Sequence, residues 1–206
     1  MAGSVGNAWQ ETVKVSISTQ GGSEIEYDSL LESISFEGFE KEFDLIHLLN
    51  GGNLEKLTPE GPWSVTLKLY PLDAATDTGT TAKGVFDLLH QTDTSQPVSI
   101  EADRGRNRVR ICVLFSDGVT SGNAAQAVVF AAGTVRALRF VGADAFVTKV
   151  TPGEYGADPF SVELTIKGAP FGEDGVELYM WENISGTGTM AAIAAYTSTA
   201  TGIILT

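Results

Sequence analysis

Four arginines at alternating positions are the side chains whose spacing most directly indicates a charged binding surface. They are Arg104, Arg106, Arg108 and Arg110. Residues two apart in a strand point to the same side, so the pattern predicts a basic stripe along one face. Guanidinium groups pair with carboxylates and phosphates. The stripe fits contact with a phosphate backbone or an acidic neighbouring subunit, or a solvated strand face that balances nearby acids. Of the two binding hypotheses the acidic neighbour is preferred, because the rest of the chain is negative.

No other arrangement of reactive side chains predicts catalysis or cofactor binding. The two histidines, His47 and His90, are far apart and lack partners at metal-ligand spacing. The sequence contains neither a Gly-x-Ser-x-Gly motif nor a phosphate-binding loop ending in Gly-Lys-Ser/Thr. We therefore expect a protein that is not an enzyme and that uses no metal and no cofactor.

The single cysteine, Cys112, excludes an intramolecular disulfide. It lies in the apolar run Ile111–Phe115. A thiol in such a run packs as a small hydrophobic side chain, so we expect a buried and unreactive group.

The composition is that of an acidic, globular β protein. The 206 residues carry a net charge of −13, and 43% of them are hydrophobic. An acidic surface disfavours binding to nucleic acid, and it is also compatible with adaptation to high salt or with a negative cavity. The start of the chain does not resemble a secretory signal, and no apolar run is long enough to predict a transmembrane helix.

Alternation of apolar and polar residues predicts several strands. The clearest are Thr12–Ser18, Ser33–Asp44, Trp63–Tyr70 and Phe160–Lys167. A further pair is predicted at Thr134–Val141 and Ala145–Val150, around Gly142-Ala143-Asp144. The spacing of apolar residues in Lys83–His90 predicts one short helix. We predict a single domain over residues 1–206, mainly β, with a flexible arm at residues 1–11. Its architecture is expected to be an antiparallel β-sandwich or partly open barrel of about 8 to 10 strands with one short α-helix.

The connection between the strands at residues 33–44 and 63–70 is unusually long and apolar. Residues 45–62 show no evident element, and loops of this length are often functional. The loop carries Leu45, Ile46, Leu48, Leu49, Leu54 and Leu57. Two fates for these side chains stay open, namely burial against a partner subunit and packing back on the same domain. The apolar end of the chain, residues 186–206, likewise predicts a subunit contact or an edge strand.

The order of residue types in residues 33–70 resembles that of the tail tube proteins (major tail proteins) of long-tailed viruses of bacteria or archaea. The stretch contains, in order, Ser33-Ile34-Ser35-Phe36-Glu37-Gly38, Asp44-Leu45-Ile46, Gly51-Gly52 and the strand end Leu69-Tyr70. The later run Arg136–Val141 with Ala145–Thr148 is similar to a region near the end of these proteins. The resemblance covers roughly residues 12–168, with gaps.

The resemblance implies a structural virion protein located in the viral tail and made in the host cytoplasm. Family members form hexameric rings in which each subunit adds strands to a ring-shaped multi-subunit barrel, and the rings stack into a tube. The implied partners are further copies of the chain, a tape-measure protein inside the tube, and tail terminator and tip proteins at its ends. Viral DNA passes through without specific binding, and no membrane insertion is implied. The six apolar residues of the 45–62 loop are expected to mediate stacking, and the arginine stripe to contact an acidic neighbour.

A carbohydrate-binding or adhesion β-sandwich module is the alternative function. Aromatic side chains line many sugar sites, although core packing is their commoner use. The candidates are Trp9, Trp63, Trp181, Tyr70, Tyr155 and Tyr179.

Overall fold

The computed structural model describes residues 12–22, 24–27, 31–70, 108–116, 123–153, 156, 160–197 and 203. These residues form ten strands and contain no helix. The strands are β1 Thr12–Thr19, β2 Ile25–Glu26, β3 Leu31–Glu37, β4 Phe43–His47, β5 Asn53–Leu57, β6 Trp63–Leu69, β7 Arg108–Ser116, β8 Val128–Pro152, β9 Val162–Gly168 and β10 Tyr179–Met190. The predicted helix at Lys83–His90, the arm at residues 1–11, and Arg104 and Arg106 lie outside the described residues.

Eight of the strands form one antiparallel sheet. Its order is β2-β1-β7-β8-β9-β6-β3, and β10 pairs with β8 as a branch from this path. The other two strands, β4 and β5, pair only with each other. The prediction of a mainly β, antiparallel fold is confirmed. The sheets are open and do not close into a barrel.

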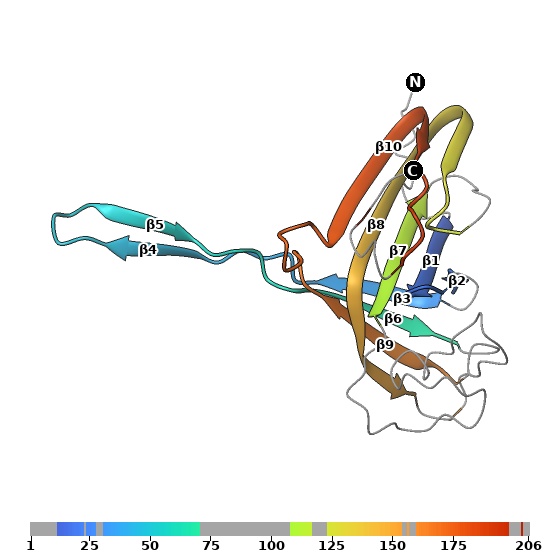
Figure 1. Ribbon diagram of the computed structural model, residues 1–206, viewed down its shortest axis with the longest axis horizontal. Helices are drawn as coiled ribbons and strands as arrows, with labels where there is room; N and C mark the ends of the chain where they lie inside the picture. Colours follow the sequence, from blue (N-terminus) through green and yellow to red (C-terminus); the bar gives the residue numbers. More distant parts are fainter. Residues whose placement is uncertain are drawn as a thin grey trace.

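Strand β8 joins the two halves of the large sheet. One of its edges pairs with β7, while the other pairs with β10 up to Gly142 and with β9 from Phe146 onward. Between these partners Asp144 has a left-handed backbone (φ 52°), and the register with β7 shifts nearby. Such an irregularity bends a strand and increases its twist. β8 therefore carries one wing made with β10, β7 and β1, and a second wing made with β9, β6 and β3 (Figure 1).

The two wings enclose the main hydrophobic core. Along β6 every second residue is buried, as predicted for Val65, Leu67 and Leu69. Across the core, the ring of Phe140 on β8 lies 5.4 Å from that of Trp63 and 5.3 Å from that of Phe36. These edge-on contacts join the β3–β6 wing to β8.

Two glycines make room for the buried indole of Trp63. A Cβ at Gly142 or at Gly168 would lie 2.3 Å from atoms of the ring. The indole Nε1 donates a hydrogen bond to the carbonyl of Ala169 at 3.1 Å. Any larger residue at these glycines therefore displaces a fully buried aromatic side chain.

The outer face of the first wing is also buried. Cys112 and Leu114 on β7 and Val141 on β8 pack there against Met190 and Ile193. The apolar end of the chain thus covers its own sheet over the described residues 190–197, which we call the C-terminal strap. The predicted segment starts inside β10, whose only described partner strand is β8, and its contact with another subunit stays a prediction.

The sequence-based strand boundaries are wrong around Asp144. The predicted turn at Gly142-Ala143-Asp144 is a bulge within the continuous strand β8, because paired neighbours on both edges keep the chain extended. The predicted strand at Ser33–Asp44 ends at Glu37. Beyond it Gly38 (φ 90°) and Phe39 (φ 64°) are left-handed and turn the chain out of the sheet.

Candidate assembly interface

Residues 38–62 form a β-hairpin that projects from the body of the molecule (Figure 1). Strands β4 and β5 pair from Phe43↔Leu57 to His47↔Asn53. At the tip the Leu48 amide donates to the Gly52 carbonyl at 2.8 Å. The prediction of a loop without secondary structure at residues 45–62 is therefore wrong.

Most of the exposed large hydrophobic side chains of the described residues lie on the hairpin. In the described part of the chain eleven large hydrophobic side chains are exposed, and seven of the eleven lie on the hairpin. They are Phe43, Leu45, Ile46, Leu48, Leu49, Leu54 and Leu57, which are 43% to 110% exposed. Six of these are the residues that the sequence assigned to a subunit interface. Among the described residues nothing of the body packs over them, so this part of the structure provides no cover for the apolar ribbon.

Both faces of the hairpin are apolar. Residues paired directly across two antiparallel strands point to the same face. The pair Phe43↔Leu57 lies on one face and the pair Ile46↔Leu54 on the other. A hairpin that covers a groove of its own body needs only one apolar face. Two apolar faces fit a ribbon inserted between two surfaces.

Aromatic packing fixes the root of the hairpin to the body. The ring of Phe39 lies 5.1 Å from that of Tyr179 and 6.0 Å from that of Trp181, both on β10. The hydroxyl of Tyr179 donates to the Glu60 carboxylate, and burial together with this bond raises the pKa of Tyr179 to about 12. At Gly38 a Cβ would lie 2.3 Å from the Pro62 carbonyl oxygen. These contacts set the direction in which the hairpin leaves the body.

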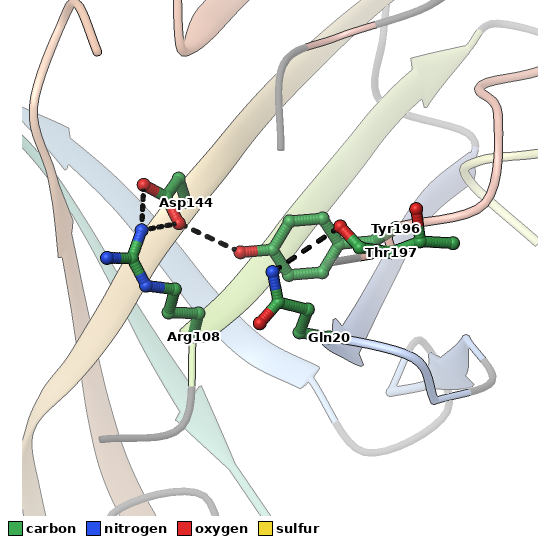
Figure 2. A network of polar contacts seen from close by, with 5 residues as sticks. All are labelled: Gln20, Arg108, Asp144, Tyr196 and Thr197. Atoms are coloured by element: carbon green, nitrogen blue, oxygen red, sulfur yellow. Dashed lines mark hydrogen bonds and ion pairs between the residues drawn. The ribbon is translucent and has the colours of Figure 1, made fainter. Parts of the chain in front are cut away.

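The described part of the arginine stripe is paired within the chain. Figure 2 shows Arg108 donating to the carboxylate of Asp144, which also accepts a hydrogen bond from the Tyr196 hydroxyl at 3.1 Å. Burial and the nearby Asp144 carboxylate raise the pKa of Tyr196 above its ordinary value. In the same view Gln20 donates to the Thr197 carbonyl at 3.4 Å. The bonds of Tyr196 and Thr197 tie the C-terminal strap to β8 and to the residue that follows β1.

Arg110 is buried rather than displayed. Its guanidinium donates to the Glu24 carboxylate and to the Ala194 carbonyl of the strap, and it lies 5.9 Å from the Tyr196 ring. The acids that Arg108 and Arg110 contact belong to the same chain, which corresponds to the alternative of balancing nearby acids. Contact of the stripe with an acidic neighbour stays a prediction.

A second buried arginine, Arg139 on β8, holds the same strap. Its guanidinium donates to the Glu182 carboxylate at 2.6 Å and to the carbonyls of Ala191 at 2.6 Å and Gln126 at 3.1 Å. The side chain of Arg139 is fully buried, and that of Glu182 is 24% exposed. The sequence does not identify Arg139 as an anchor, because its partners lie 13 to 52 residues away.

The residues considered for metal binding and for sugar binding do not come together in the described part of the structure. Among the described residues no cluster of His, Cys, Asp and Glu could hold a metal ion. His47 Nδ1 donates to Asn53 Oδ1 at 2.6 Å within the hairpin. Of the proposed sugar-binding aromatics, Trp63 is buried in the core and Tyr179 is bonded to Glu60, while Trp181 is 42% exposed. Trp9 and Tyr155 lie outside the described residues, and Trp63 and Tyr179 are engaged within the chain.

Cys112 is expected to be inert in the folded protein. It is fully buried, and burial raises the pKa of its thiol to about 12. Because only the thiolate reacts with disulfide reagents, and it forms only near that pH, native protein at pH 8 should give no reaction with a thiol-specific chromogenic disulfide. In denaturant one thiol per chain should react. Rapid reaction of the native protein would show that the strap does not seal this face.

Among the described residues, the structure contains no helix with the length and apolarity that a membrane crossing requires.

Comparison with known proteins gives only distant structural similarities. Family models and curated protein sequences yield no match. Among solved structures, the chain is similar to a component of the extended sheath–tube complex of the PVC extracellular contractile injection system, with 15% identity and a TM-score of 0.43 over 83% of this chain and 89% of that one. It is also similar to a component of the tube-terminating cap of the anti-feeding prophage, with 12% identity and a TM-score of 0.42 over 82% and 88% of the two chains. At these values the similarities assign neither a fold nor a function to this chain.

Proposed function

We propose that this protein is the repeating structural subunit of a viral tail tube, in which stacked rings of identical copies surround a channel for DNA. The observation that carries the proposal is the hairpin with apolar residues on both faces. Burying one large apolar side chain stabilises a contact by about 1.5–3 kcal/mol, so seven exposed ones favour association strongly. The resemblance of residues 33–70 to tail tube proteins specifies the kind of assembly.

The strand edges support lateral joining of the copies. Among the described strands, β3 and β10 each have one neighbour in the sheet. The backbone donors and acceptors along such edges pair readily with a strand from another chain. Repeated joining around a rotation axis closes a ring, and six copies per ring is the number that the resemblance implies.

The charge suits a channel that DNA traverses. The net charge of −13 places carboxylates in excess of basic groups by a factor of two. Carboxylates facing a lumen repel phosphates, so that DNA slides without adhering. In this proposal a tape-measure protein occupies the tube before DNA does, and terminator and tip proteins close its ends.

Removal of the hairpin tests the proposal. Glu42 and Thr58 already contact each other across its base, with the Thr58 amide 2.8 Å from the Glu42 carbonyl oxygen. Replacing residues 43–57 by a two-residue Asn-Gly turn should therefore leave the body folded, with an unchanged thermal melting curve. The shortened chain should remain monomeric in sedimentation velocity at concentrations where the full chain assembles. Normal tubes from the shortened chain would exclude the hairpin as the stacking element.

A further inference from the structure

A cavity lies near the root of the hairpin. It is bordered by the β9–β10 connection on one side and by Arg108 on β7 and Phe146 on β8 on the other. It has a volume of about 520 Å³. Its apolar lining includes Phe171, Val176 and Leu178, and its polar lining includes Arg108, Asp144, Glu173 and Asp174. The volume falls in the range of cavities that enclose a small ligand or a few side chains.

The connection that borders this cavity is ordered by its own bonds. Phe171 and Glu177 form an isolated antiparallel β-bridge, and the Gly172 amide donates to the Val176 carbonyl at 2.8 Å. The Asp174 carboxylate accepts a hydrogen bond from the Val176 amide at 3.2 Å. The turn nevertheless leaves Phe171 46% and Val176 44% exposed. These are two of the four exposed large hydrophobic side chains that the described residues carry outside the hairpin.

The tip of the hairpin is apolar and free of carboxylates, which complements the apolar and acidic lining of the cavity. Leu48 and Leu49 are exposed, and residues 47–53 contain no carboxylate. Asn50 Oδ1 accepts from the Gly52 amide at 2.9 Å, and Asn53 Oδ1 accepts from His47. Because the amide oxygens are engaged inside the tip, the side-chain nitrogens of Asn50 and Asn53 are the groups of these amides that can donate to another surface.

We propose that the tip of the hairpin of one copy docks in this cavity of a second copy, with Leu49 against Phe171 and Val176. The inference rests on the proposed function and specifies the surface that receives the hairpin. Carboxylates of Glu173 and Asp174 at the rim accept the amide donors of the tip. The same carboxylates repel the acidic segments that dominate this chain, so the cavity selects the carboxylate-free tip by charge.

The arrangement also fixes how copies repeat. Tip and cavity are different surfaces, so the contact is heterologous and continues from copy to copy. The cavity adjoins the hairpin root, since Tyr179, directly after the β9–β10 connection, contacts both Phe39 and Glu60. Twelve residues separate Gly38 from Asn50, which sets an upper limit of about 40 Å at ~3.3 Å per residue, since Gly38 and Phe39 are not extended. Successive copies along the hairpin direction are therefore spaced by at most about 40 Å.

Disulfide cross-linking between two single variants tests the docking. Leu49→Cys and Val176→Cys both alter exposed side chains, and the only native cysteine is buried. The two proteins, one of them tagged, are mixed at assembling concentration and mildly oxidised, and linked peptides are identified by mass spectrometry. The matched control replaces Val176→Cys with Thr151→Cys, an exposed position near the end of β8. We expect at least about tenfold more linkage at position 176 than at position 151, because docking raises the local concentration of the thiols.

Electron microscopy of the same samples distinguishes a failure of the docking from a failure of the proposed function. Tubes with the 49–176 linkage support both the docking and the proposed function. Tubes in which position 49 links no better to 176 than to 151 would overturn the docking and leave the tube subunit intact. Samples with neither tubes nor the linkage would overturn both.

Discussion

Removing either apolar pair of the hairpin should abolish assembly while the body stays folded. The two variants are Phe43→Ser with Leu57→Ser, and Ile46→Ser with Leu54→Ser. These pairs lie on opposite faces of the ribbon. If each face contacts a neighbour, loss of two large apolar side chains weakens that contact by about 3–6 kcal/mol. The concentration needed for assembly should rise by roughly 10²- to 10⁴-fold in sedimentation velocity.

The cross-strand charged pair provides a matched control. Asp44 and Lys56 lie opposite each other on the same face as Ile46 and Leu54. Replacing both by serine removes exposed charges, which contribute about 0–1 kcal/mol, and should shift assembly by less than about tenfold. All variants should melt like the wild type, because the hairpin lies outside the core. Assembly that survives loss of one apolar pair would show that this face is exposed to solvent in the tube.

Replacing Arg139 with alanine should have the largest effect on stability of any single substitution considered. The change leaves the Glu182 carboxylate without its partner and removes the donors that hold Ala191 and Gln126. Breaking a buried ion pair by removing one partner costs about 3–5 kcal/mol. The free energy of unfolding, measured with urea, should fall by that amount, and Cys112 should become reactive as the strap loosens.

An exposed ion pair on the same strand serves as the comparison. Lys149 on β8 pairs with Glu163 at 3.2 Å, and both side chains are about half exposed. Lys149→Ala should change the free energy of unfolding by at most about 1 kcal/mol. Equal effects of Arg139→Ala and Lys149→Ala would contradict the assignment of Arg139 as the anchor of the strap.

The half-buried strands could be predicted because one face of each packs on the core. In β6 burial alternates strictly with the sequence pattern, and in β9 the apolar residues Val162, Leu164 and Ile166 are buried, although Thr165 between them is buried too. The two strands pair from Trp63↔Gly168 to Leu69↔Val162. The same holds for Ile34 and Phe36 on β3, which pack against the core from one face. Local periodicity carries this information without knowledge of the neighbours.

The hairpin escaped prediction because it has no buried face. Leu45 and Ile46 are adjacent, as are Leu48 and Leu49, so apolar residues occupy both faces and period two disappears. The dipeptide Asn50-Gly51 is nonetheless a strong hairpin signal, and Gly51 is left-handed in the structure (φ 81°). The structure leaves the six apolar residues exposed on an element that was not predicted, and their role in a subunit interface stays a prediction.

Long-range pairing explains the remaining differences. Gly142-Ala143-Asp144 suits a turn and a bulge equally, and the choice depends on β7, β9 and β10, which are distant in sequence. Arg110 occupies a regular position in an alternating stripe, but its Glu24 partner lies 86 residues away. No local pattern distinguishes a buried arginine with distant partners from an exposed one.

The most direct test of the central claim is electron microscopy of the purified full-length protein over a range of protein and salt concentrations. The account predicts rings or tubes with a central channel, and an axial repeat of at most about 40 Å, the upper limit set by the length of the hairpin. A uniform monomer under every condition, with the hairpin exposed, would contradict the account.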